Sequence, residues 1–195
     1  EFGGEPDYQK GSEWLEKAAN VGSLEAMRTL GELALAGNLP GNKPSQSLHW
    51  FIMAAEKGDA ESQTRLGELF YIGDIVKQNL KLGMEWIHKA AAQNYGPAEA
   101  ALATMYTQGL LDGPDHSKAA MWARRGAMQG DPLAQRTLGL LYLENKGVQP
   151  SKLPKRIDHK RHAFKWLTLA KNGGVSDLEP ALNLLQKEME PRDLK

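Results

Sequence analysis

Tryptophan recurs every 36 residues along most of this 195-residue chain. Three other columns keep the same interval: a leucine, the small residue that follows it, and the residue four positions after the leucine. The columns are Trp14, Trp50, Trp86 and Trp122; Leu30, Leu66, Leu102 and Leu138; Gly31, Gly67, Ala103 and Gly139; and Ala34, Phe70, Tyr106 and Tyr142. Trp166 follows Trp122 after 44 residues, so the last unit contains eight extra residues. Several columns in one register indicate a tandem repeat, in which stacked units complete one another's core.

The residues around each tryptophan have the period of an α-helix. In the second unit, apolar or small residues lie at i, i+3, i+4, i+7 and i+8 and make one stripe: Ser47, Trp50, Phe51, Ala54 and Ala55. The leucine–glycine segments have the same period. We therefore expect an all-α chain of helix–turn–helix pairs, each with a leucine–glycine helix and a tryptophan helix. The strict register also predicts that the tryptophans fill the core between helices.

Residues that start and stop helices support this pattern. We expect a left-handed residue after each tryptophan helix, side-chain caps on three leucine–glycine helices, prolines in first turns, and a glycine between the two helices of a unit. In that order, the residues are Gly22, Gly58, Asn94, Gly130 and Gly174; Ser23, Asp59 and Asp131; Pro97, Pro132 and Pro180; and Gly37, Gly73 and Gly109.

The repeat predicts a single repeat domain over residues 1–195. The domain begins with half a repeat at 7–22, because the leucine–glycine partner of the first tryptophan helix is missing. Full units follow at 23–58, 59–94, 95–130 and 131–174. Asn183 replaces the usual small residue of its column, which predicts a capping helix with a more polar outer side at 175–190. These boundaries predict ten helices.

The column patterns LG..(Y/F)..G and W...AA..G together resemble Sel1-like repeats, which are relatives of the tetratricopeptide repeats, over roughly residues 7 to 190. The resemblance implies a right-handed α-solenoid of about four to five repeats with a C-terminal capping helix. It also implies a non-catalytic scaffold or adaptor, bacterial when free-standing, that binds a partner protein in its concave groove. Some bacterial immunity proteins resemble such arrays, so an inhibitor that neutralises a secreted toxic enzyme is the alternative.

Composition argues against several functions. The chain has 24 Lys plus Arg and 24 Asp plus Glu, so no net charge attracts it to nucleic acid or an anionic membrane. It has no cysteine, which excludes disulfides and thiolate chemistry and slightly favours a periplasmic or otherwise extracytoplasmic compartment over the cytoplasm. No apolar run approaches the roughly 20 residues that span a bilayer.

The chain contains no recognisable catalytic, cofactor-binding or metal-binding motif. His159 and His162 share a helical face at i and i+3, and two such nitrogens are able to bind zinc, but the lysines and arginines around them repel a cation. We expect a solvated helix start there. We therefore predict no catalytic residue, no cofactor and no metal, and an enzyme that depends on these histidines is the last alternative.

Surface columns that differ between units are free to bind a partner, whereas columns that repeat serve the architecture. The resemblance implies that the leucine–glycine helices line the groove. The predicted partner-binding residues are Arg28, Glu32, Thr64, Glu68, Tyr71, Thr104, Thr107 and Arg136. Tyr71 and Arg136 are the strongest candidates, because Tyr and Arg are enriched in binding hot spots. The alternative is that Leu140 and Leu143 pack on the next unit and that the charges are only solvated.

The inserted residues form a second candidate surface, a basic loop at 146–162. Its positive residues are Lys152, Lys155, Arg156, Lys160 and Arg161. Such a patch predicts salt-sensitive contact with nucleic acid, lipid headgroups or an acidic protein. The alternative is a plain solvated loop.

Overall fold

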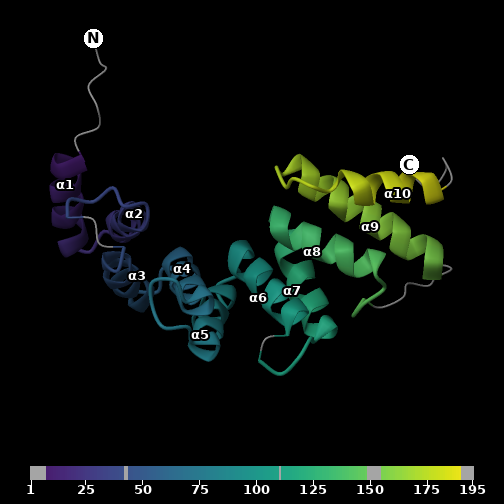
Figure 1. The fold of residues 1–195 in the computed structure, drawn as a ribbon, viewed down its shortest axis with the longest axis horizontal. Coiled ribbons are helices and arrows are strands. Elements are labelled where there is room, and N and C mark those ends of the chain that lie inside the picture. The colour runs from purple at the N-terminus through teal and green to yellow at the C-terminus, as the bar shows by residue number, and fades with distance from the viewer. Residues whose placement is uncertain (1–7, 42–43, 110, 149–154, 190–195) are drawn as a thin grey trace, which may run out of the picture. The chain divides into compact units, whose positions relative to one another are not determined.

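The structure is a computed structural model that describes residues 8–41, 44–109, 111–148 and 155–189. These residues form ten α-helices and no strand, which confirms the all-α prediction (Figure 1). The helices are α1 (Tyr8–Asn20), α2 (Leu24–Leu35), α3 (Gln46–Glu56), α4 (Ala60–Ile72), α5 (Leu80–Ala91), α6 (Gly96–Gln108), α7 (His116–Met128), α8 (Pro132–Leu143), α9 (Lys155–Asn172) and α10 (Glu179–Glu188). We call α2, α4, α6, α8 and α10, which carry the leucine column, the first helices, and the five tryptophan helices the second helices.

The chain divides into two compact units, an N-terminal unit (Glu1–Gln93) and a C-terminal unit (Asn94–Lys195). In the N-terminal unit each helix from α1 to α5 packs on the next one. In the C-terminal unit the same holds from α6 to α10, and α6 also packs on α8. Each helix therefore depends on its sequence neighbours for burial, as expected for a repeat array. None of the described helices combines the length and the apolar character needed to cross a membrane.

The predicted capping residues are confirmed. Ser23, Asp59 and Asp131 accept hydrogen bonds from the backbone N–H groups three residues on, at 3.2, 2.8 and 2.8 Å. The predicted left-handed residues have φ between 58° and 100°, and the three predicted prolines lie in the first turns of α6, α8 and α10. Asn79 and Asp115, which were not predicted as caps, cap α5 and α7 in the same way.

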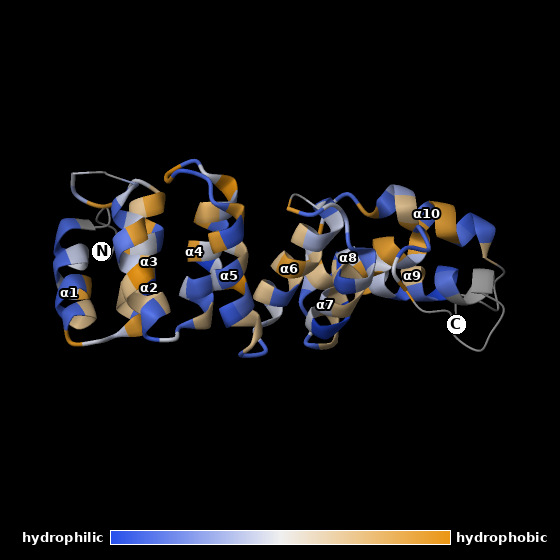
Figure 2. Ribbon diagram, turned by 90° about the horizontal axis from the view of Figure 1, so that it is seen from below, coloured by the Kyte–Doolittle hydropathy of each residue, from blue (hydrophilic) through white to orange (hydrophobic). Residues whose placement is uncertain are grey.

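The leucine column lies at the centre of the helix packing. Leu30, Leu66 and Leu102 are 0 % exposed, and burying a leucine fully contributes about 1.5–3 kcal/mol relative to leaving it in water. The glycine column beside it lets the second helix approach closely: a Cβ added at Gly31 would lie 2.6 Å from the Phe51 ring. Figure 2 shows hydrophobic and hydrophilic residues alternating along the helices, as expected when one side of each helix is buried.

The tryptophans lie closer to solvent than the register predicts. Trp14 is 70 % exposed, so the prediction of a core position is wrong there, because α1 packs chiefly on α2. The other four tryptophans are half-buried at the edge of the core. Four of the five rings carry a cation over one face, which contributes about 0.5–1 kcal/mol at exposed sites. The pairs are Lys17–Trp14 (4.5 Å to the ring centroid), Lys89–Trp86 (3.7 Å), Arg125–Trp122 (4.7 Å) and Lys165–Trp166 (4.9 Å).

Candidate partner-binding surface

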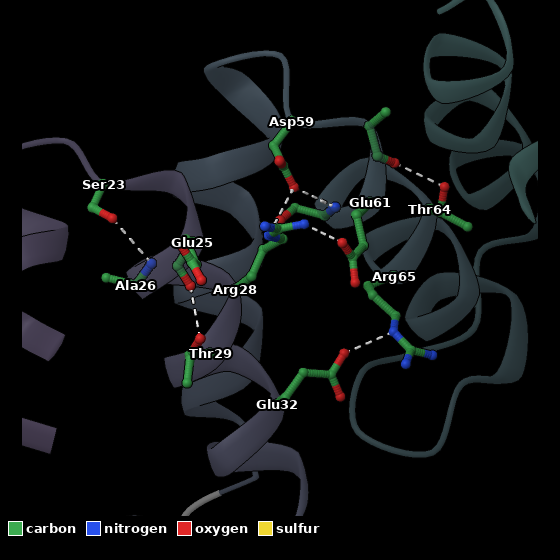
Figure 3. A network of polar contacts seen from close by, with 12 residues as sticks. Ser23, Glu25, Ala26, Arg28, Thr29, Glu32, Asp59, Glu61, Thr64 and Arg65 are labelled. Carbon is green, nitrogen blue, oxygen red and sulfur yellow. Dashed lines mark hydrogen bonds and ion pairs between the residues drawn. The ribbon is translucent and has the colours of Figure 1, made fainter. Parts of the chain in front are cut away.

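In the N-terminal unit, ion pairs connect the outward faces of α2 and α4 (Figure 3). Arg28 of α2 contacts Glu61 and lies 3.8 Å from the Asp59 carboxylate. Arg65 of α4 pairs with Glu32 of α2 at 2.7 Å, and also with Glu68 one turn further along α4 at 3.1 Å. Three of the predicted contact residues, Arg28, Glu32 and Glu68, are thus already paired within the fold.

These ion pairs fix the direction of the side chains more than they stabilise the unit. Burial acts to lower the pKa of the Arg65 guanidinium, but Glu32 and Glu68 outweigh burial and raise that pKa above its ordinary value. The side chains of the pair Arg65–Glu32 are 45 % and 43 % exposed, and exposed pairs contribute about 0–1 kcal/mol each. The network is therefore a charged surface held in one arrangement.

The other two predicted residues of this unit lie at different depths. Thr64 is 5 % exposed and its hydroxyl donates to the Ala60 carbonyl at 2.8 Å, so it points into the fold. Tyr71 is half-buried at the end of α4, where burial raises the pKa of its phenol. Of the two, Tyr71 is the residue that a partner could reach.

A small hollow lies between α2, α4 and the loop after α4. It has a volume of about 210 Å³ and is lined by Leu35, Arg65, Glu68, Leu69, Ile72, Asp74 and Ile75. Ile72 is 56 % exposed in its wall. This hollow was not predicted from the sequence, but comparison of the units gives a signal for it. The residues equivalent to Ile72 are Ala36, Gln108 and Glu144, so this repeat position is strongly apolar in this unit alone.

In the C-terminal unit, the predicted threonines have their hydroxyl hydrogens engaged. Thr104 donates to the Ala100 carbonyl at 3.1 Å and Thr107 donates to the Ala103 carbonyl at 2.8 Å. Such bonds to the preceding helical turn leave the oxygen lone pairs as acceptors for a partner. Both threonines are therefore modest contact residues at best.

The outward face of α8 differs from those of α2 and α4. Arg136 is exposed and makes no ion pair with any residue that the structure describes. Leu133 lies one turn before it and is 57 % exposed. Leu140 and Leu143 are half-buried against the core of the C-terminal unit, so these two leucines pack within the fold. The surface of α8 thus presents an exposed leucine beside a guanidinium that has no ionic partner in the part of the chain that the structure describes.

The basic segment is helical where the structure describes it. Residues 155–162 form the beginning of α9, so the prediction of a loop is wrong there. α9 starts 11 residues before Trp166, whereas α7 starts six residues before Trp122, so much of the insertion lengthens the second helix. Lys160 pairs with Glu188 of α10 at 2.6 Å. Lys152 lies outside the described residues, as do the side chains of Lys155 and Arg156, and Arg161 is half-buried.

The two histidines of this segment form a packing cluster. His159 is 6 % exposed, so the prediction of a solvated helix start is wrong for it. Its ring meets the edge of Tyr142 at 5.8 Å, and His162 stacks on the same tyrosine at 4.8 Å. The described part of the chain holds no group of three or more residues suited to bind a metal ion.

A buried carboxylate lies in the C-terminal unit and was not identified from the sequence. Glu99 of α6 is 0 % exposed and pairs with Arg125 at 2.8 Å, and the Gln129 amide donates to it at 2.5 Å. Burial raises the pKa of Glu99, and the Arg125 charge opposes this only in part. The equivalent residues are Met27, Gln63 and Gln135, so the signal in the sequence was a charged residue at a repeat position that is uncharged in the other units.

The raised pKa predicts how stability depends on pH. Because the pKa of Glu99 is higher in the folded state than in the unfolded state, the folded state holds the Glu99 proton more strongly. The contribution of Glu99 to the free energy of unfolding therefore falls as the pH rises from the unfolded pKa to the folded pKa. We expect the parent chain to lose stability relative to Glu99→Gln as the pH is raised above the ordinary glutamate pKa of about 4.3. Urea midpoints of both chains across pH 4–8 measure this. If the parent chain instead became more stable relative to the variant as the pH rises, the attraction of the Arg125 charge would outweigh the burial of Glu99.

Comparison with known proteins identifies the repeat. The family model of the Sel1 repeat matches at residues 1–23, 24–59, 60–95, 96–131 and 132–175. A solved Sel1 repeat protein from Oxalobacter formigenes is 25 % identical, with a TM-score of 0.81, and the match covers 96 % of this chain and 76 % of that one. A protective antigen of uropathogenic Escherichia coli with an SLR fold is 28 % identical, with a TM-score of 0.73 over 84 % of this chain. This chain spans 33 % of that protein's length. No curated protein matches the chain.

Proposed function

Because the chain belongs to the Sel1 repeat family, whose members are generally non-catalytic scaffolds that bind other proteins, we propose that it binds a partner protein through the outward faces of its first helices. In helix-pair solenoids the first helices line a concave groove, and we propose that the partner binds there. We propose first that the protein is an adaptor. The alternative is that it binds a toxic enzyme through the same faces and inhibits that enzyme.

The face of α8 is the observation that carries this proposal. Leu133 and Arg136 occupy the positions that hold Glu61 and Thr64 in α4. In the N-terminal unit Glu61 pairs with Arg28 and Thr64 is buried, so both serve the fold. The exposed Leu133 and Arg136, which has no ion pair with a described residue, contribute nothing comparable to the fold. Arginine is enriched in binding hot spots, and the leucine beside it adds apolar surface that a partner can bury.

The test is capture of a partner from cells that express the protein, followed by titration of that partner with three chains. The surface variant carries Leu133→Ser and Arg136→Glu. The control variant carries Met128→Ser and Lys81→Glu, which make the same two changes on second helices, since Met128 is 76 % exposed and Lys81 is exposed. We expect the surface variant to bind at least about tenfold more weakly than the parent, as loss of a hot spot requires.

The control variant is expected to bind like the parent. Equal binding by the parent and the surface variant would contradict the proposed face, and equal weakening in both variants would indicate a non-specific effect of charge. The partner's own chemistry then separates adaptor from inhibitor: a captured enzyme that loses turnover in the complex assigns the inhibitor alternative.

A further inference from the structure

We propose that the hollow between α2 and α4 receives one leucine-sized apolar side chain of the partner protein, flanked in the partner by lysine or arginine. This inference rests on the proposed function and adds to it the chemistry of the segment that is recognised. It concerns the N-terminal unit alone, since every lining residue belongs to that unit.

The size of the hollow suits a single side chain. Its volume of about 210 Å³ is below the roughly 300–1,000 Å³ of typical small-molecule pockets, but above the ~150 Å³ of an apolar cavity that holds benzene. Leu35, Leu69, Ile72 and Ile75 supply its apolar wall. Ile72 is 56 % exposed there, so an apolar group that enters would bury surface that now faces water.

The charges at the edge of the hollow select the flanking residues. Arg65 is held by Glu32 at 2.7 Å and by Glu68 at 3.1 Å, so its charge is already balanced. Asp74 is exposed and makes no ion pair or hydrogen bond with another described residue. The charged residues that line the hollow are thus one arginine and two carboxylates, Glu68 and Asp74, and Glu32 beside them pairs with the same arginine, so negative charge exceeds positive charge around an apolar centre. Such an arrangement attracts a cationic segment and repels an acidic one.

The hollow is a property of this unit and not a consequence of the repeat. The residues equivalent to Glu68 and Ile72 in α6 are Thr104 and Gln108, which supply neither the charge nor the apolar wall. The residue equivalent to Arg65 is Ala101, so the clamp of Glu32 and Glu68 on a guanidinium is absent there as well. The repeat architecture does not fix these positions, yet in α4 they are apolar and lie beside carboxylates. This difference between units is expected if the positions bind a specific partner.

The test uses short capped peptides and the ¹⁵N-labelled full chain. The probe peptide has the sequence Gly-Lys-Leu-Lys-Gly, and two matched peptides replace its leucine by alanine or both lysines by glutamate. We expect the probe to shift the amide signals at the end of α4 and in the following loop. We expect it to bind about tenfold more tightly than the alanine peptide, in keeping with burial of one leucine side chain. The glutamate peptide should bind more weakly still, and added salt should weaken the probe.

Two variants place the site. Ile72→Ser is expected to abolish the preference for leucine over alanine, whereas Met121→Ser, at an apolar residue of similar exposure on the second helix α7 (49 % against 56 %), leaves that preference unchanged. Equal binding of the leucine and alanine peptides, a preference for the glutamate peptide, or an equal effect of both variants would overturn the inference. These readouts need no natural partner, so their failure is distinguishable from failure of the proposed function, which the partner titration tests.

Discussion

Replacing Arg125 by alanine is expected to lower the free energy of unfolding of the C-terminal unit by about 3 kcal/mol at neutral pH. The arginine is the ionic partner of Glu99, whose side chain is 0 % exposed. Its removal leaves a buried carboxylate with the Gln129 amide as its hydrogen-bond donor among the described residues. Because Arg125 itself is 41 % exposed, we take the lower end of the range of about 3–5 kcal/mol for breaking a buried pair. Urea denaturation followed by circular dichroism measures the loss.

The buried charge itself is the predicted cause, and a second substitution tests this. Glu99→Gln alone is expected to stay within about 1 kcal/mol of the parent, because a neutral group there needs no counter-ion and glutamine occupies the same repeat position at residues 63 and 135. Adding Glu99→Gln to Arg125→Ala should recover most of the lost stability. A double variant as unstable as Arg125→Ala would instead attribute the loss to the stacking of Arg125 on Trp122.

The substitution Gly83→Ala is expected to destabilise the N-terminal unit by about 1–3 kcal/mol, the usual cost of overpacking. A Cβ at Gly83 would lie 2.7 Å from the backbone oxygen of Gly67, and a Cβ at Gly67 would lie 2.8 Å from the backbone oxygen of Gly83. A backbone oxygen cannot rotate away as a side chain can. The two helices α4 and α5 would therefore have to separate.

Gly11 provides the matched control, because it occupies the same repeat column in α1 and a Cβ added there meets nothing within 4 Å. Gly11→Ala is expected to be neutral or to stabilise the unit by up to about 1 kcal/mol through helix propensity. Thermal and urea denaturation of both variants give the comparison. A stabilising effect at both positions would show that α4 and α5 separate without cost.

The architecture could be predicted from the sequence because packing imposes a period on it. The leucine column marks what is buried, the glycine column marks where a neighbouring helix comes close, and Ser23, Asp59 and Asp131 mark helix starts. Each of these is a local rule that repeats in every unit, so several copies support the same conclusion. The Sel1 repeat assignment followed from the same columns.

The surface could not be predicted in the same way, because it depends on which side chains meet across helices. The pairs Arg28–Glu61 and Glu32–Arg65 are each 33 residues apart, an interval that no 36-residue column exposes. These pairs turn two candidate contact residues, Arg28 and Glu32, into parts of a network within the fold. The burial of His159 and the exposure of Trp14 depend equally on neighbours, since one histidine lies against Tyr142 and one tryptophan lies on a helix with few contacts.

The central claim is that a partner protein binds on the faces of the first helices. Amide hydrogen exchange of the full chain, measured at short times with and without the captured partner, tests it most directly. The account predicts that the partner protects α8 around Arg136 and the end of α4 around Ile72, and that the second helices change little. Protection confined to the second helices, or to α9 around Lys160 and Arg161, would contradict it.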